Sequence, residues 1–185
     1  QKKLDLAKNR MYCNYAFYFG ATADNGDELA DLEKLEGCCG IKLFAGSSTG
    51  NLLVAEEEDI DRVFQNSSKV VAVHSEDEAI LNTNKKLIKD GDVHTHPVWR
   101  SAECAISSTR RIVRLANKYN KKAHVLHITT KQEIDFLSQH KGNITFEITP
   151  QHLTIYAPDC YDKLGTYAQM NPPIRDRSHY DRLWF

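Results

Sequence analysis

The feature that most constrains the fold of this chain is a regular alternation of short apolar runs with helix-like segments. Helical spacing of apolar residues, or a helix-start pattern, separates each run from the next. Parallel neighbouring strands need a crossover connection that is usually helical, so this order predicts a parallel α/β sheet. The five runs with the composition of buried strands are residues 14–20, 40–45, 69–74, 122–129 and 143–149.

Helices are expected where apolar residues recur at a spacing of three or four, or where a capping residue opens the segment. Thr130 and Glu133 form a capping box for the helix that follows the fourth strand and ends at Gly142. Residues 91–100 are expected to form a loop, and the chain after residue 149 is expected to be loop-like through residues 170–175. The other expected helices cover residues 1–11 and 77–89, or begin near Asn25, Glu56 and Ser101.

Composition excludes several classes of function. A net charge of −1 over 185 residues lacks the electrostatic footprint of a protein that mainly binds nucleic acid or an anionic membrane surface. No stretch approaches the roughly 18 consecutive apolar residues of a membrane span, and the first residues lack the apolar core of a signal peptide. The five cysteines are an odd number and thinly spread, which favours a reducing cytoplasm over a disulfide framework. We therefore expect a cytoplasmic chain whose partner is a small molecule.

The pattern alone leaves a doubly wound sheet and a β/α barrel open. Residues 20–26, after the first strand, lack the GxGxxG spacing of a dinucleotide site, and no GxxxxGK[ST] motif occurs. The sequence therefore disfavours both a dinucleotide-binding site and a P-loop. A complete eight-unit barrel typically needs about 250 residues. The length of 185 residues therefore argues against a complete barrel.

Three polar residues lie at or near the ends of predicted strands. His74 ends one strand, His127 lies near the end of another, and Lys42 is embedded in a third. Active sites of parallel α/β proteins lie at the carboxyl ends of the strands. Burial favours a neutral lysine amine, which can act as a nucleophile or capture carbon dioxide as a carbamate. A carbamate has two oxygens that can bridge two metal ions, and each histidine can add a ring nitrogen. Taken singly, each histidine is better explained as a core residue satisfied by one backbone hydrogen bond.

Other polar residues have weaker signals. His94 and His96 form an HxH pair, but they lie in a turn-like segment before Pro97, so we expect no metal ligation from them. Cys104 is expected to be a small core residue. Asn171 precedes two prolines that hold its backbone extended, so its amide could both donate to and accept from a cyclic amide. A simple turn-initiating asparagine is the alternative.

Seven ordered motifs resemble the dihydroorotases of the amidohydrolase superfamily. They cover nearly the whole chain and are Phe17–Thr22, Gly40–Phe44 followed by Gly46–Asn51, Val73–Glu78, His96–Ser101, His124–Thr130, Glu147–Leu153 and Met170–Arg175.

The resemblance implies a (β/α)8 TIM barrel with a two-zinc centre. Lys42 matches the lysine that is carboxylated to bridge the zinc ions, and His74 and His127 match the histidines that bind the second zinc. Asn171 matches the asparagine that contacts the ring of dihydroorotate. Ser48 and Thr49 lie where related enzymes have a substrate-closing loop.

The resemblance also implies that part of the site lies outside this sequence. The family's first strand supplies an HxH pair and a substrate-binding arginine, and its last strand supplies an aspartate as general acid/base; no segment of this sequence matches either strand. We therefore expect no catalytic residue in this chain, and we expect residues 1–185 to be the central part of one barrel domain, strands three to seven. Gln169 and Gln151 depart from the family's usual residues without removing a proposed ligand.

The resulting hypothesis is a dihydroorotase, which reversibly cyclises N-carbamoyl-L-aspartate to dihydroorotate in pyrimidine biosynthesis with Zn²⁺. The family commonly forms homodimers, and this portion alone is expected to be inactive. One alternative is a dihydropyrimidinase or hydantoinase relative, although these usually have serine at the position of Asn171. The other alternative is a metal-free amidohydrolase-like scaffold.

Overall fold

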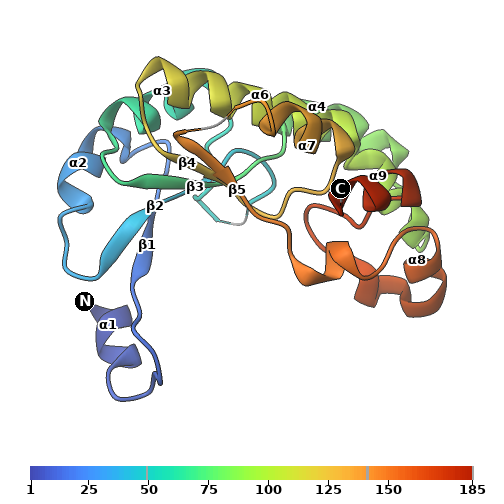
Figure 1. Ribbon diagram of the computed structural model, residues 1–185, viewed down its shortest axis with the longest axis horizontal. Helices are drawn as coiled ribbons and strands as arrows, with labels where there is room; N and C mark the ends of the chain where they lie inside the picture. The colour runs from blue at the N-terminus through green and yellow to red at the C-terminus, as the bar shows by residue number, and fades with distance from the viewer. Residues whose placement is uncertain (49, 141, 185) are drawn as a thin grey trace.

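The computed structural model describes residues 1–48, 50–140 and 142–184. Its five strands form one sheet in the order β1-β2-β3-β4-β5, and every neighbouring pair is parallel. Helices cover one side of this sheet (Figure 1). The predicted parallel α/β sheet is therefore confirmed. The strands are β1 Phe17–Gly20, β2 Cys38–Phe44, β3 Val70–His74, β4 Ala123–Val125 and β5 Ile144–Phe146.

The two faces of the sheet have different compositions, as the strand register shows. Leu43, Val73 and Val125 are paired across β2, β3 and β4, and all three are fully buried against the helices. Side chains alternate between faces along a strand, so Lys42 and its partner row lie on the opposite face. That row runs from Lys42 through Ala72 and His124 to Thr145. Polar residues therefore occupy the face away from the core.

Three helices supply the apolar side chains that cover the sheet face of Leu43, Val73 and Val125. They are α3 (Glu57–Asn66), α6 (Ala102–Lys118) and α7 (Lys131–Leu137). Each fully buried aliphatic or aromatic side chain contributes about 1.5–3 kcal/mol to stability, so this layer fixes the sheet from one side. The buried side chains of these helices include Ile60, Val63 and Phe64 of α3, Ile112 and Leu115 of α6, and Leu137 of α7.

Capping residues determine where several helices begin. The predicted capping box is present in α7, where Thr130 Oγ1 accepts from the Glu133 N–H and the Glu133 carboxylate accepts from the Thr130 N–H. Ser101 caps α6 by accepting from the Cys104 N–H. Asp77 caps α4 (Glu78–Asn84), which continues into a 3₁₀ turn, η2 (Lys85–Leu87). Each such cap is typically worth about 1 kcal/mol.

Some predicted helix boundaries were wrong. The helix α1 (Lys2–Ala7) is shorter than expected, and α7 ends at Leu137 rather than at Gly142. A 3₁₀ helix begins directly after Asn25, close to the predicted start, but the Asn25 side chain does not cap it. That side chain accepts from the Thr22 N–H and donates to the Gly20 carbonyl, so it stabilises the turn after β1. The chain then forms η1 (Gly26–Glu28) and a single turn of helix, α2 (Leu29–Leu32).

Two segments expected as loops contain short helices. Residues 91–100 form η3 (Val93–Thr95) and α5 (His96–Trp99). After β5 the chain forms η4 (Pro150–Leu153), α8 (Asp159–Leu164), η5 (Gly165–Ala168) and α9 (Arg177–Leu183). Helices this short are marginal in isolation and show little periodicity, because tertiary packing stabilises them. Here a separate apolar cluster does so, formed by Ala157, Cys160, Tyr161, Ala168 and Ile174.

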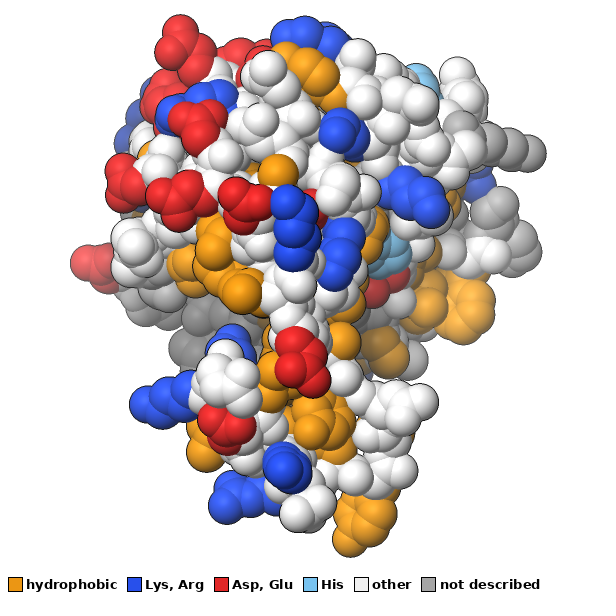
Figure 2. Space-filling view, turned by 90° about the vertical axis from the view of Figure 1, so that its left-hand side faces the viewer, with side chains coloured by type: hydrophobic (Ala, Val, Ile, Leu, Met, Phe, Trp, Pro, Cys, Tyr) orange, Lys and Arg blue, Asp and Glu red, His pale blue; other side chains and the backbone are white. Residues whose placement is uncertain are grey.

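The face around α1 carries exposed hydrophobic side chains, among them Leu6, Met11 and Tyr12. Figure 2 shows this side of the molecule, where acidic and basic side chains are interspersed above α1. A cavity of about 330 Å³ lies here between α1, β1 and the start of β2, and none of the predicted site residues lines it. Within the described residues, no helix is long and apolar enough to cross a membrane.

Gly40 allows β2 to approach its neighbours closely. A Cβ atom at this position would lie 2.5 Å from the Val70 carbonyl oxygen and 2.9 Å from Tyr18 Cε1. We expect Gly40→Ala to lower the free energy of unfolding by about 1–3 kcal/mol, because β2 must move away from β3. Urea denaturation measures this change. Gly26→Ala is the control, since its nearest atom outside the local chain is 3.3 Å away; equal losses in the two variants would contradict the prediction.

Candidate functional site

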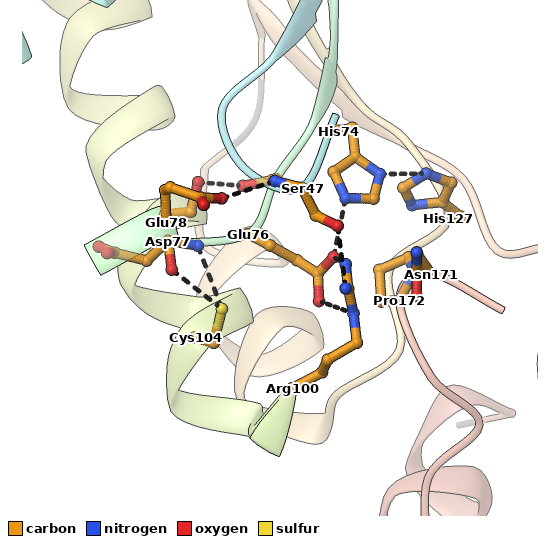
Figure 3. A network of polar contacts seen from close by, with 12 residues as sticks. Ser47, His74, Glu76, Asp77, Glu78, Arg100, Cys104, His127, Asn171 and Pro172 are labelled. Atoms are coloured by element: carbon orange, nitrogen blue, oxygen red, sulfur yellow. Dashed lines mark hydrogen bonds and ion pairs between the residues drawn. The ribbon is translucent and has the colours of Figure 1, made fainter. Parts of the chain in front are cut away.

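The structure brings the two predicted histidine ligands together. His74 is the last residue of β3, and His127 lies two residues beyond the end of β4, so parallel pairing places both at the same edge of the sheet. His74 Nδ1 is 3.1 Å from His127 Nε2, and the rings are nearly perpendicular (Figure 3). His127 has a φ of 37°, an unusual conformation for a non-glycine residue. The backbone turn at His127 thus accompanies the approach of the two rings.

The pair fits the spacing of zinc ligands. Two nitrogens bound to one tetrahedral zinc at 2.0–2.1 Å stand roughly 3.3 Å apart, close to the observed separation. Burial above all, with a smaller effect of the nearby His74 and Lys42, lowers the pKa of His127 to about 3, so its ring is the neutral form that binds metal. His127 Nδ1 is buried and has no hydrogen-bond partner among the described residues. The donor set therefore suits a metal ion but is incomplete.

Lys42 supplies the third candidate ligand. It lies in β2, is half-buried, and its ammonium group stands 4.2 Å from the centre of the Phe44 ring. Burial lowers the pKa of Lys42 to about 8, against the opposing charge of Glu147. A neutral amine is the form that captures carbon dioxide, so this environment suits a carbamate. In the described part of the chain, no group of three or more His, Cys, Asp or Glu side chains has metal-site geometry.

The loop after β2 is anchored through Ser47. The Ser47 N–H donates to Glu78 Oε2 at 2.8 Å, and Arg100 Nη1 donates to Ser47 Oγ at 2.9 Å. Ser48, one of the predicted substrate contacts, is half-buried in this loop. Thr49, the other, lies outside the described residues. The sequence did not single out Ser47, because its role depends on residues 31 and 53 positions away.

Asn171 is exposed and held by a buried histidine. His96 Nε2 lies 3.2 Å from Asn171 Oδ1, and His96 Nδ1 lies 3.4 Å from the Tyr161 hydroxyl. Burial, aided by the charge of Arg100, lowers the pKa of His96 to about 4, so the ring is neutral. His94 turns elsewhere and pairs with Asp162 on the surface. The two histidines of the HxH motif thus share a ring contact with Tyr161 but face different polar partners, Asp162 and Asn171.

Buried charged side chains lie behind the histidine pair, and two of them, Glu76 and Arg100, form an ion pair. Glu76, Arg100, Glu133 and Arg175 are almost completely buried, and Arg175 donates to the backbone carbonyls of Pro97 and Arg100. In the sequence, Glu76 and Arg100 stand out only as parts of the motifs Val73–Glu78 and His96–Ser101. The available signal was the spacing of Glu76, two positions after a strand-terminal histidine. Cys104 is buried as predicted, and burial raises the pKa of its thiol to about 12.

Comparison with known proteins assigns the chain to a group of relatives. No family profile matches it. It is 28% identical to the dihydroorotase of Methanosarcina mazei over 95% of this chain and 41% of that protein, and 25% identical to the allantoinase of Escherichia coli over 98% of this chain and 43% of that protein. The chain is a homologue of the cyclic amidohydrolases. It spans about two fifths of the length of these relatives.

The solved structures similar to this cyclic amidohydrolase homologue support the fold. The L-hydantoinase (dihydropyrimidinase) from Arthrobacter aurescens matches 99% of the chain with a TM-score of 0.89, at 23% identity and over 42% of its own length. A D-hydantoinase matches with a TM-score of 0.81. The five parallel strands with alternating helices are thus a stretch of a TIM-barrel amidohydrolase fold, as the family resemblance implied.

His152 supports the segment that carries Asn171. Its Nδ1 contacts Thr149 Oγ1 at 2.7 Å, and its Nε2 contacts the Pro172 carbonyl at 3.3 Å. Burial lowers the pKa of His152 to about 4, whereas an unfolded histidine titrates near 6.5. The folded state therefore binds about one proton fewer than the unfolded state between these pH values, and stability falls as the pH drops from 6.5 to 4.

We expect His152→Gln to remove this contribution. Its free energy of unfolding should depend on pH with a slope lower by up to about 1.4 kcal/mol per pH unit near pH 5. Urea denaturation at several pH values between 7 and 4 measures the slopes of the variant and of the parent protein. Identical slopes would contradict the assignment of a neutral, buried His152.

Proposed function

We propose that this chain is the central part of a dihydroorotase barrel and that its strands are the third to seventh of eight. The observation that carries the proposal is the convergence of His74 and His127 ring nitrogens at 3.1 Å, beside a half-buried lysine on the neighbouring strand. The dihydroorotases among the sequence relatives, at 26–29% identity, support the choice of substrate. The reaction would be the reversible cyclisation of N-carbamoyl-L-aspartate.

The chain's own residues would perform three tasks in this reaction. His74, His127 and carboxylated Lys42 would hold zinc, which supplies Lewis-acid activation of the ring carbonyl. Asn171, exposed and held by His96, would bind the ring amide. The loop that carries Ser48 would cover the substrate. Residues beyond this chain would complete the metal site and move the proton.

Turnover by the full-length protein tests this proposal. Its kcat/KM should be highest for dihydroorotate among dihydroorotate, dihydrouracil, hydantoin and allantoin, and metal analysis should find about two zinc ions per active site. A preference for one of the other three cyclic amides would instead support a hydantoinase or allantoinase. A folded protein with no bound metal and no turnover would support the scaffold alternative.

Lys42→Gln should remove the carbamate and one bridge between the metal ions. We expect the zinc content to fall and kcat to drop at least about 100-fold, because even outer-shell changes at metal sites cost 10–100-fold. Carbon-13 NMR of protein equilibrated with labelled bicarbonate should show a carbamate signal in the parent protein alone. Lys69→Gln is the matched control, since the Lys69 amine bonds the Cys38 carbonyl near the amino ends of the strands. Retention of the signal in Lys42→Gln would contradict the assignment.

Asn171→Ser introduces the residue usual in dihydropyrimidinases. We expect kcat/KM for dihydroorotate to fall by about 10–100-fold, the cost of one lost hydrogen bond with an unpaired polar group. His96→Phe should also lower kcat/KM for dihydroorotate, through a higher KM, but by less than Asn171→Ser. It leaves the amide in place and removes only its support. Asn143→Ser is the control, because Asn143 pairs with Asn120 on the exposed surface. Unchanged steady-state kinetics in Asn171→Ser would count against a substrate contact.

A further inference from the structure

A buried hydrogen-bonded network lies on the side of His74 that faces away from His127. His74 uses both ring nitrogens, with Nδ1 toward His127 and Nε2 toward Glu76 Oε2 at 2.8 Å (Figure 3). Arg100 contacts the same carboxylate twice, through Nε to Oε1 at 3.1 Å and through Nη2 to Oε2. Glu76 therefore receives three donors from two side chains.

Burial restricts what Glu76 can do. Glu76 is completely buried and Arg100 is 2% exposed, so neither side chain offers a surface to substrate. A buried carboxylate is costly unless it is paired and hydrogen-bonded, and the planar guanidinium of Arg100 satisfies it on two atoms. The role that remains for Glu76 is to position other groups.

An ionised carboxylate fixes the tautomer of His74. It can only accept hydrogen bonds, so the hydrogen of a neutral His74 ring must sit on Nε2. Nδ1 then carries the lone pair, and it is the nitrogen that faces His127. The same arrangement, with a carboxylate behind a histidine ligand, orients metal-binding histidines in general.

Arg100 also reaches the loop after β2. Its third nitrogen, Nη1, donates to Ser47 Oγ at 2.9 Å. Ser47 has a φ of 49°, a left-handed conformation that is unfavourable for a residue with a Cβ and needs support from its surroundings. The bonds from Arg100 and to Glu78 provide that support.

The backbone of this loop rests directly on Glu76. A Cβ atom at Gly46 would lie 2.3 Å from the Glu76 carbonyl oxygen, so only glycine permits this approach. The loop that precedes Ser48 and the ring of His74 are therefore both held by Glu76 and Arg100.

We propose that Glu76 and Arg100 form one positioning unit with two roles. It holds the His74 ring with Nδ1 unprotonated, and through Ser47 it fixes the loop that carries Ser48. The metal-binding part of this inference rests on the proposed function. The tautomer and the loop contacts do not depend on it.

Nitrogen-15 NMR of the full-length protein tests whether Glu76 fixes the tautomer of His74. Long-range proton–nitrogen correlations of His74 should show a protonated Nε2 and an unprotonated Nδ1 in the parent protein. In Glu76→Gln, a measurable fraction of His74 should carry its proton on Nδ1, and the zinc affinity, measured by competition with a chelator, should fall by 10–100-fold. Glu57→Gln is the matched control, because Glu57 pairs with Arg114 on the exposed surface. A parent His74 protonated on Nδ1 overturns the proposal without any variant.

Amide hydrogen exchange tests whether Glu76 and Arg100 fix the loop through Ser47. Ser47→Ala removes the Arg100–loop bond and should speed exchange at residue 47 by about fivefold, the effect of one ordinary hydrogen bond, while leaving the His74 tautomer unchanged. Glu76→Gln should speed exchange there as well, because Arg100 loses its fixed partner. In steady-state kinetics, Ser47→Ala should raise KM and leave kcat within twofold. Ser138→Ala, which loses an exposed bond to the Asp135 carbonyl, is the control. Exchange in Ser47→Ala and Glu76→Gln equal to that of the control overturns the coupling.

Failure of the proposed function and failure of the positioning unit would give different results. If the parent protein binds no zinc and turns over none of the four cyclic amides, while His74 is protonated on Nε2 and both variants loosen residue 47, the positioning unit stands without the metal. If zinc binds and Glu76→Gln keeps both the affinity and the tautomer of the Glu57→Gln control, the proposed function stands and the positioning unit fails.

Discussion

Parallel pairing of β2, β3 and β4 is the constraint on which the site depends. It puts the carboxyl ends of these strands at one edge of the sheet, so His74 and His127 meet although they are 53 positions apart in sequence, and Lys42 lies on the neighbouring strand, two residues before its end. The helical layer of α3, α6 and α7 buries the opposite face and makes the register costly to change, because a slip of one residue would exchange the apolar row for the polar one. The geometry of the histidine pair thus depends on the packing of the core on the other side of the sheet.

Charge is distributed differently on the two sides of the histidine pair. On the sheet face away from the helices, half-buried Lys42 stands over an aromatic ring and its pKa is lowered by burial. Behind His74, Arg100 and Arg175 lie in the interior, and Glu76 balances the first of them. Burial alone would raise the pKa of Glu76, but the bond from His74 and the charge of Arg100 outweigh it and lower the pKa to about 2. An ionised group can therefore remain in a region where an isolated charge would be unstable.

Local patterns predicted the strands and the capping box of α7, because each depends on neighbours within a turn or on the composition of one short run. Lys42, His74 and His127 stood out for the same reason, as polar residues at or near strand ends. The supports of the site could not be found in this way. Arg100 contacts Glu76 across 24 positions and Ser47 across 53, and His96 reaches Asn171 across 75. The short helices after β5 were missed because an apolar cluster of their own stabilises them, rather than a periodic pattern.

The two histidines that hold the Asn171–Pro172 segment have a consequence for how this protein responds to acidity. His96 and His152 are both kept uncharged by burial until the pH falls to about 4. The amide of Asn171 therefore rests on supports whose protonation does not change anywhere in the neutral range. Lys42, with a pKa of about 8, changes its charge within that range. Acidity near neutrality thus changes the charge of the uncarboxylated Lys42 amine and leaves the two histidines behind the amide contact uncharged.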